Sequence, residues 1–168
     1  MDFIYDYIHV NTFWTILFIT HALLAVALLG ALTHQAMSVA MPVRQPAGPR
    51  GFVTRFRGVS GAGYATAVCI LWVVTFLFGA WIYTKYRMYV RIPIETQGFW
   101  KTQGVFELKE HLASIGLGLL PIYWLLWKDV RNSEFASARK WLTVVIAAMV
   151  WYMFLVGHIV NNVRGFGS

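Results

Sequence analysis

Five histidines and one acidic cluster are the residues of this chain whose side chains can do chemistry. His21, His111 and His158 fall inside long apolar runs, whereas His9 and His34 lie near the ends of such a run. An ionisable side chain inside a membrane helix is costly, so by default it is a functional residue that faces the interior of a helix bundle. The histidines therefore define the first candidate site.

Depth along the helices pairs two of these histidines. With about 1.5 Å of rise per residue, His111 and His158 both lie roughly 5 to 8 Å inside the same membrane boundary, on two different helices. A low-spin haem takes one axial nitrogen from each side of the macrocycle, so we expect this pair to ligate a haem b. His21 lies roughly 15 Å deep, and a helix tilt of about 20° lets it replace either partner. Arg91 and Arg164 are candidate contacts for the haem propionates.

Glycines give this expectation slight support, because a flat macrocycle between helices needs small neighbours. Gly30, Gly116, Gly118 and Gly157 lie inside the apolar runs, and the last of them adjoins His158. Glycine is common in membrane helices in any case. The alternative interpretation is that the histidines only form hydrogen bonds between helices or lie at the interface.

The sequence E-L-K-E-H forms a second constellation at the outer mouth of the third apolar run. Glu107 and His111 are four residues apart and share a helical face, and Glu110 lies beside them. Two carboxylates and an imidazole at a membrane boundary can pass protons for a quinone or bind a divalent metal. Because Lys109 is adjacent, the alternative is an ordinary ion-pair cluster at the surface.

The elements that must position these residues are predicted to be membrane helices. The 168 residues are 58% hydrophobic and 12% charged, whereas a soluble domain has about 25% charged residues. We therefore expect an all-α integral membrane protein, a single domain over residues 1–168 in contact with the lipid bilayer. Four runs of spanning length predict a four-helix bundle, with spans at about 12–39, 61–83, 106–127 and 141–160.

Basic residues in the connections predict the topology and exclude nucleic acid as a partner. Four Lys or Arg residues follow the first span, four more connect the third and fourth spans, and none precedes the first. Five lie between the second and third spans, where acids accompany them and a flap at the interface is expected. The positive-inside rule then puts both termini on the outer, periplasmic side. The single cysteine, Cys69, excludes an internal disulfide and a four-cysteine zinc site.

Four short spans with histidines on the first, third and fourth resemble the small bacterial b-type cytochromes that serve as membrane subunits of respiratory complexes. The resemblance covers the whole chain in architecture and depends on histidine placement. It implies one haem b, ligated first by His111 and His158 and next by His21. It further implies a multi-pass protein of the bacterial inner membrane that relays electrons between quinol and a periplasmic partner, together with other subunits.

Other functions remain open from the sequence. The chain can be a cofactor-free structural or assembly subunit of a respiratory or photosynthetic complex. It can be a quinol-binding subunit that uses Glu107, Glu110 and His111, or His21 can ligate a chlorophyll. Because no soluble catalytic domain is expected, the chain is at most an electron-transfer subunit and not a complete enzyme.

Overall fold

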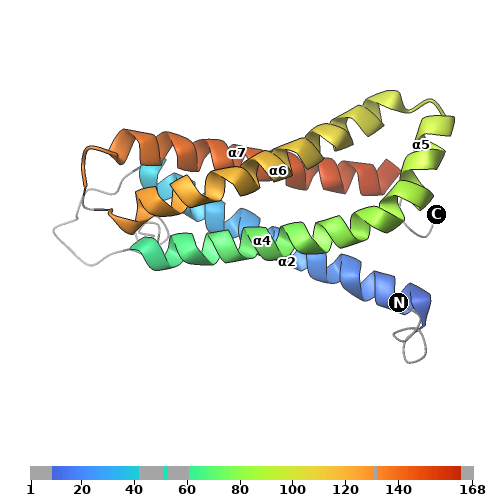
Figure 1. The fold of residues 1–168 in the computed structure, drawn as a ribbon, viewed down its shortest axis with the longest axis horizontal. Helices are drawn as coiled ribbons and strands as arrows, with labels where there is room; N and C mark the ends of the chain where they lie inside the picture. The colour runs from blue at the N-terminus through green and yellow to red at the C-terminus, as the bar shows by residue number, and fades with distance from the viewer. Residues whose placement is uncertain (1–8, 42–50, 53–60, 131, 164–168) are drawn as a thin grey trace.

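The computed structural model describes residues 9–41, 51–52, 61–130 and 132–163, and these contain helices and no strand. Four long helices are joined in part by shorter ones (Figure 1). In chain order the elements are α2 (Val10–Ala40), α4 (Gly61–Tyr86), the π-helix η1 (Arg87–Arg91), α5 (Ile92–Thr96), α6 (Trp100–Lys128) and α7 (Ala136–Val163). The prediction of an all-helical protein is confirmed.

The four long helices form a bundle in which α2 packs on α4 and α7, and α6 packs on the same two helices. α2 begins and α7 ends at the same end of the bundle, where η1 and α5 also lie (Figure 1). We call this the α5 end. Toward it α2 and α6 diverge, whereas the helices lie closer together at the opposite end. Which side of a membrane the α5 end faces stays a prediction.

Three helical stretches among the described residues are long and apolar enough to cross a membrane, namely Val10–Ala40, Gly63–Thr96 and Ala136–Val163. They overlap the first, second and fourth predicted spans, as expected of a multi-pass membrane protein. The third predicted span lies within α6, which is long enough but less apolar. Its charged residues Glu107, Lys109 and Glu110 lower its apolar content.

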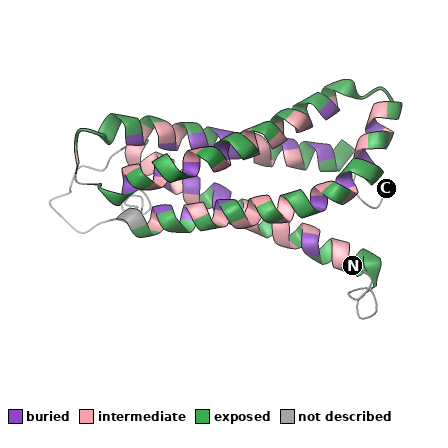
Figure 2. Ribbon diagram, viewed as in Figure 1, coloured by how far each residue is buried: buried purple, intermediate pink, exposed green. Residues whose placement is uncertain are grey.

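Exposed residues line the outward sides of the helices (Figure 2), and many of them have large apolar side chains. Leu23 on α2 is 66% exposed, Ile115 on α6 is 54% exposed and Ile159 on α7 is 57% exposed. A soluble protein rarely exposes apolar patches on this scale. The surface is compatible with contact with lipid, in which helices satisfy their own backbone hydrogen bonds.

The main core lies where the four helices are close together and is built around aromatic residues. Trp72, Tyr123 and Trp127 are at most 3% exposed there. The ring of Trp72 covers Gly116 on α6 so closely that an added Cβ would lie 2.5 Å from its Cη2 atom. Glycine thus allows α4 and α6 to approach each other, as small residues do in membrane helix pairs.

Hydrogen bonds join α6 and α7 at the end opposite α5. The indole N–H of Trp127 donates to Oγ1 of Thr143 at 3.0 Å, and that hydroxyl donates to the carbonyl of Arg139 at 2.7 Å. The Arg139 guanidinium donates to three carbonyls in and after the last turn of α6, at 3.1 to 3.3 Å. Arg139 therefore caps the C-terminus of α6, where carbonyls lack helical partners.

The segment after the second span differs from the expected flap. The chain continues from α4 through η1 and α5 as one helical stretch and reverses at Gly98, which has φ of 78°. The N–H of Phe99 donates to the carbonyl of Ile94, and the N–H of Gly98 to that of Glu95, both at 3.0 Å. This is a Schellman C-cap, in which glycine supplies the left-handed residue. It returns the chain into α6.

Candidate functional site

Polar side chains from η1, α5 and the ends of two long helices meet at the α5 end. Arg91 Nε lies 2.8 Å from Glu95 Oε1, and Arg91 Nη2 lies 3.2 Å from Glu107 Oε1. Gln103 donates to Glu107 at 3.1 Å, and the Tyr86 hydroxyl donates to Gln103 at 3.0 Å. We call these five residues the mouth cluster. It holds the Glu107 carboxylate with two donors from different elements.

Local helical geometry explains how the mouth cluster forms. Arg91 and Glu95 are four residues apart in the sequence, and so are Gln103 and Glu107. Residues at this spacing are neighbours on a helix surface. Arg91 is the last residue of the π-helix η1. A π turn widens the helix by one residue and is frequent at functional sites. Arg91 thus lies at the end of a widened turn and faces Glu107 on α6.

Lys109 lies on the inward side of α6 beside the mouth cluster. Its Cε atom is 3.6 Å from the position that a Cβ at Gly157 would occupy, so its stem crosses the contact with α7. Its ammonium lies 4.5 Å from the centroid of the Phe106 ring. The described residues provide no ion pair to Lys109 within 4 Å, although the adjacent Glu110 interacts with it electrostatically. Lys109 is thus a half-buried cation against an aromatic ring.

His21 is the predicted haem ligand that the structure places against another helix of the bundle. Its Cε1 atom lies 3.0 Å from the position that a Cβ at Gly79 on α4 would occupy. Its Nδ1 atom is buried, and the backbone of Thr75 on α4 acts on the imidazole as a hydrogen-bond partner. Oγ1 of Thr75 is buried and has no hydrogen-bond partner among the described residues. The charge of Lys109 acts on the imidazole. His21, Thr75 and Lys109 therefore belong to one polar region inside the bundle.

The other two predicted haem ligands face outward. His111 on α6 and His158 on α7 are both exposed, so neither imidazole points into the interior of the bundle. Their assignment to a haem stays a prediction, but a haem held by them lies at the surface of this chain and not among its helices. Arg164, one predicted propionate contact, lies outside the described residues. The other, Arg91, is already paired with two carboxylates.

The structure shows what lies in front of the four glycines that were expected to leave space for a macrocycle. Trp72 fills the space in front of Gly116, and Lys109 lies in front of Gly157. No atom lies within 4 Å of a Cβ added at Gly30 or Gly118. The chain's own side chains therefore occupy the interior positions where a haem between these helices would need space.

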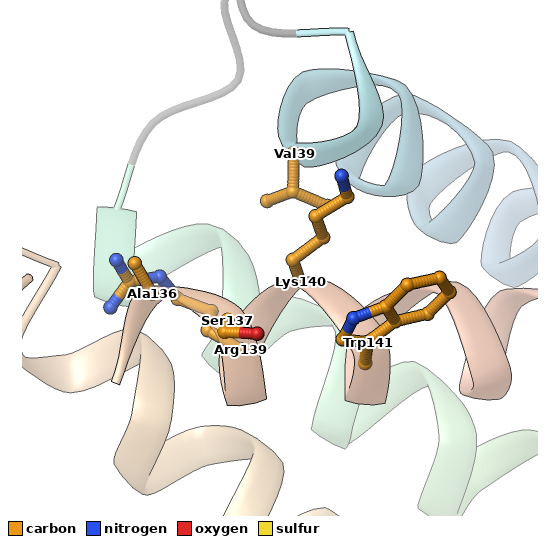
Figure 3. A pocket seen from close by; sticks show the side chains of 6 residues that line it. All are labelled: Val39, Ala136, Ser137, Arg139, Lys140 and Trp141. Atoms are coloured by element: carbon orange, nitrogen blue, oxygen red, sulfur yellow. The ribbon is translucent and has the colours of Figure 1, made fainter. Parts of the chain in front are cut away.

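A separate cavity lies at the end opposite α5, between the last turn of α2 and the first turns of α7. It is open to the surface, has a volume of about 450 Å³, and includes Val39, Ser137 and Trp141 in its lining. Lys140 extends across it toward Val39 (Figure 3). None of the predicted site residues lines this cavity. In the described parts of the chain, no group of three or more His, Cys, Asp or Glu side chains is arranged to hold a metal ion.

Comparisons of the chain with protein-family models, with curated proteins and with solved structures found no match. Any proposal of a function for this chain must therefore be argued from its own geometry. That geometry offers carboxylates that can accept protons, next to arginine, glutamine and lysine donors, at one end of an apolar bundle.

Sequence reasoning missed part of this site. It singled out Glu107 and Glu110, but not Gln103, although the spacing of four residues from Glu107 was a visible signal. Tyr86 lies 17 positions before Gln103, and only the reversal at Gly98 brings the two together.

Proposed function

We propose that the chain is a quinol-binding subunit of a bacterial membrane electron-transfer complex, which takes up the protons of quinol at the α5 end. The observation that carries the proposal is the Arg91–Glu107 pair, which joins η1 to α6 at a distance of 3.2 Å. Ionisable groups that converge in this way on an apolar bundle are by default functional. The proposal includes a periplasmic location for the α5 end and a partner subunit that carries the electrons away.

The chemistry of quinol oxidation fits the groups at this end. Oxidation of one quinol to a quinone releases two protons and two electrons. Carboxylates accept such protons, and Glu107 and Glu110 are both half-buried at the mouth of the bundle. Arg91 and Gln103 fix the Glu107 carboxylate, and a positioned acid or base contributes typically 10²–10⁴-fold to a proton-transfer step. The electrons pass to a redox centre of the partner, because proton acceptors alone cannot take them.

Quinol oxidation by native membranes tests the proposal. Membranes lacking the chain are complemented with the unsubstituted protein, with Glu107→Gln and with Glu134→Gln. Glu134 is an exposed carboxylate in the connection between α6 and α7 and serves as the matched control. We expect Glu107→Gln to lower the rate by about 10²-fold at an unchanged amount of chain, and Glu134→Gln to leave it unaltered. A full rate with Glu107→Gln refutes the proposal.

We propose second that the complex holds a haem b at the surface of this chain, ligated by His111 or His158. Their exposure supports this idea, because an exposed imidazole is open to an iron that a neighbouring subunit also ligates. A reduced-minus-oxidised spectrum of the intact complex is compared with those of His111→Ala, His158→Ala and His21→Ala. Loss of the b-type signal in one of these variants identifies the replaced histidine as a haem ligand. The absence of any b-type signal from the unsubstituted complex refutes the haem proposal and leaves the quinol proposal standing.

A further inference from the structure

Lys109 has hydrogen-bonding capacity that the described part of the protein does not use. Its ammonium carries three donors, yet the described residues give it no ion pair within 4 Å. It lies 4.5 Å from the centroid of the Phe106 ring, and the adjacent Glu110 acts on it only through its charge. The nearby Glu107 carboxylate is held by Arg91 and Gln103. A half-buried cation in apolar surroundings needs an acceptor. The structure thus leaves a donor without its acceptor just inside the mouth cluster.

Thr75 adds one more unused polar atom in the same region, beside His21. Thr75 Oγ1 is buried without a partner in the described part of the chain. The imidazole of His21 has the Thr75 backbone as a hydrogen-bond partner, and it is close enough to Lys109 for their charges to interact. Buried polar atoms in native proteins are nearly always paired, and an exception calls for an explanation such as a bound molecule. Three helices, α2, α4 and α6, therefore direct polar groups toward one region.

We infer that Lys109 forms the deep end of the quinone site, with His21 and Thr75 lining it, and donates a hydrogen bond to one carbonyl oxygen of the quinone ring. The inference rests on the proposed function and assigns its binding residues. A quinone enters from lipid, is planar and apolar, and carries its acceptors at opposite ends of the ring. One end then meets the mouth cluster and the other meets Lys109. The ring carbonyl supplies the hydrogen-bond acceptor that Lys109 lacks among the described residues.

Gly157 on α7 borders the stem of Lys109. A Cβ at this position would lie 3.6 Å from the Cε atom of Lys109, which is ordinary contact, so alanine would also fit there. The contact places the lysine stem between α6 and α7.

Quinone binding to the purified full-length chain tests the inference. Decylubiquinone is titrated into the unsubstituted protein, Lys109→Met and Lys128→Met, with tryptophan fluorescence as the signal. Lys128 is the matched control, since its ammonium also lies over an aromatic ring, that of Trp124 at 5.1 Å, at the other end of α6. We expect Lys109→Met to weaken binding at least about tenfold, as loss of a hydrogen bond from a charged donor does. Lys128→Met should bind as the unsubstituted chain does.

An infrared spectrum of quinone labelled with ¹³C at one carbonyl separates binding from a purely structural effect. We expect the carbonyl stretch to shift to lower frequency on the unsubstituted chain and to return toward its value in lipid on Lys109→Met. If Lys109→Met fails to fold, the same titration is made with His21→Gln. We expect this variant to bind decylubiquinone more weakly than the unsubstituted chain.

The outcomes distinguish the two proposals. Suppose that Lys109→Met, or His21→Gln where that variant decides, binds the quinone with the affinity of the unsubstituted chain and leaves the carbonyl band at the same lowered frequency. This result overturns the assignment of these residues but not the proposed function. No binding to the unsubstituted chain overturns both.

Discussion

Replacing Gly116 by alanine tests the packing that holds α4 against α6. The new Cβ would lie 2.5 Å from Cη2 of Trp72, closer still to Cζ2, and 3.1 Å from Cε2. Trp72 is only 2% exposed, and its indole N–H donates to the Ala113 carbonyl at 3.4 Å, so the ring cannot move freely. Overpacking of this kind costs about 1–3 kcal/mol, against roughly 0.5–1 kcal/mol gained by replacing a helical glycine with alanine. We expect a net loss of about 1–2 kcal/mol in the free energy of unfolding.

Unfolding by sodium dodecyl sulfate in mixed micelles, followed by circular dichroism, measures this loss. Gly118→Ala is the matched control two positions away, because no atom lies within 4 Å of its added Cβ. Trp72→Phe removes the atoms that clash, so Gly116→Ala should cost less in that background. A coupling of at least about 1 kcal/mol between the two changes is expected for residues in contact. Additive effects, or equal stability of the two alanine variants, would refute the close contact.

Three further changes test other contacts in the same unfolding assay. Thr143→Val should lose about 1–3 kcal/mol, because it leaves the buried N–H of Trp127 unpaired, whereas Thr143→Ser keeps the hydroxyl and should lose less; equal losses would contradict this. Arg139→Lys should destabilise the chain by about 1 kcal/mol or more, since an ammonium cannot replace the fork that binds three carbonyls, and unchanged stability would show that the cap is dispensable. The Arg91–Glu107 pair is partly exposed, so Glu107→Gln should cost at most about 1 kcal/mol and less at high salt; a larger or salt-independent loss would contradict a surface ion pair.

The helices could be predicted from the sequence because apolar runs of spanning length leave few alternatives. Each predicted span lies within one observed helix, although α6 begins at Trp100, before its apolar part. The helical course of η1 and α5 was not predicted. Charged and aromatic residues there suggested a flap, and a π turn has no composition that distinguishes it from an α-helix.

The candidate site was predicted only in part, because depth along a helix does not give the direction of a side chain. His111 and His158 were paired by depth, and both turn out to be exposed. Lys109 entered the sequence analysis only through the alternative of a surface ion-pair cluster, and the structure places it against Phe106 and Gly157. Its position depends on how α6 and α7 meet, which no spacing along one helix reveals.

The π-helix η1 holds one residue more in its turn than an α-helix would. Because its hydrogen bonds run from i to i+5, the extra residue is accommodated within the turn itself. Removing one exposed residue from η1, such as Met88, would let α4 run into α5 as a regular α-helix. The residues on either side of the turn would stay nearly in place, so Arg91 would still face Glu107 on α6. A homologue shorter by that one residue would therefore keep the Arg91–Glu107 pair.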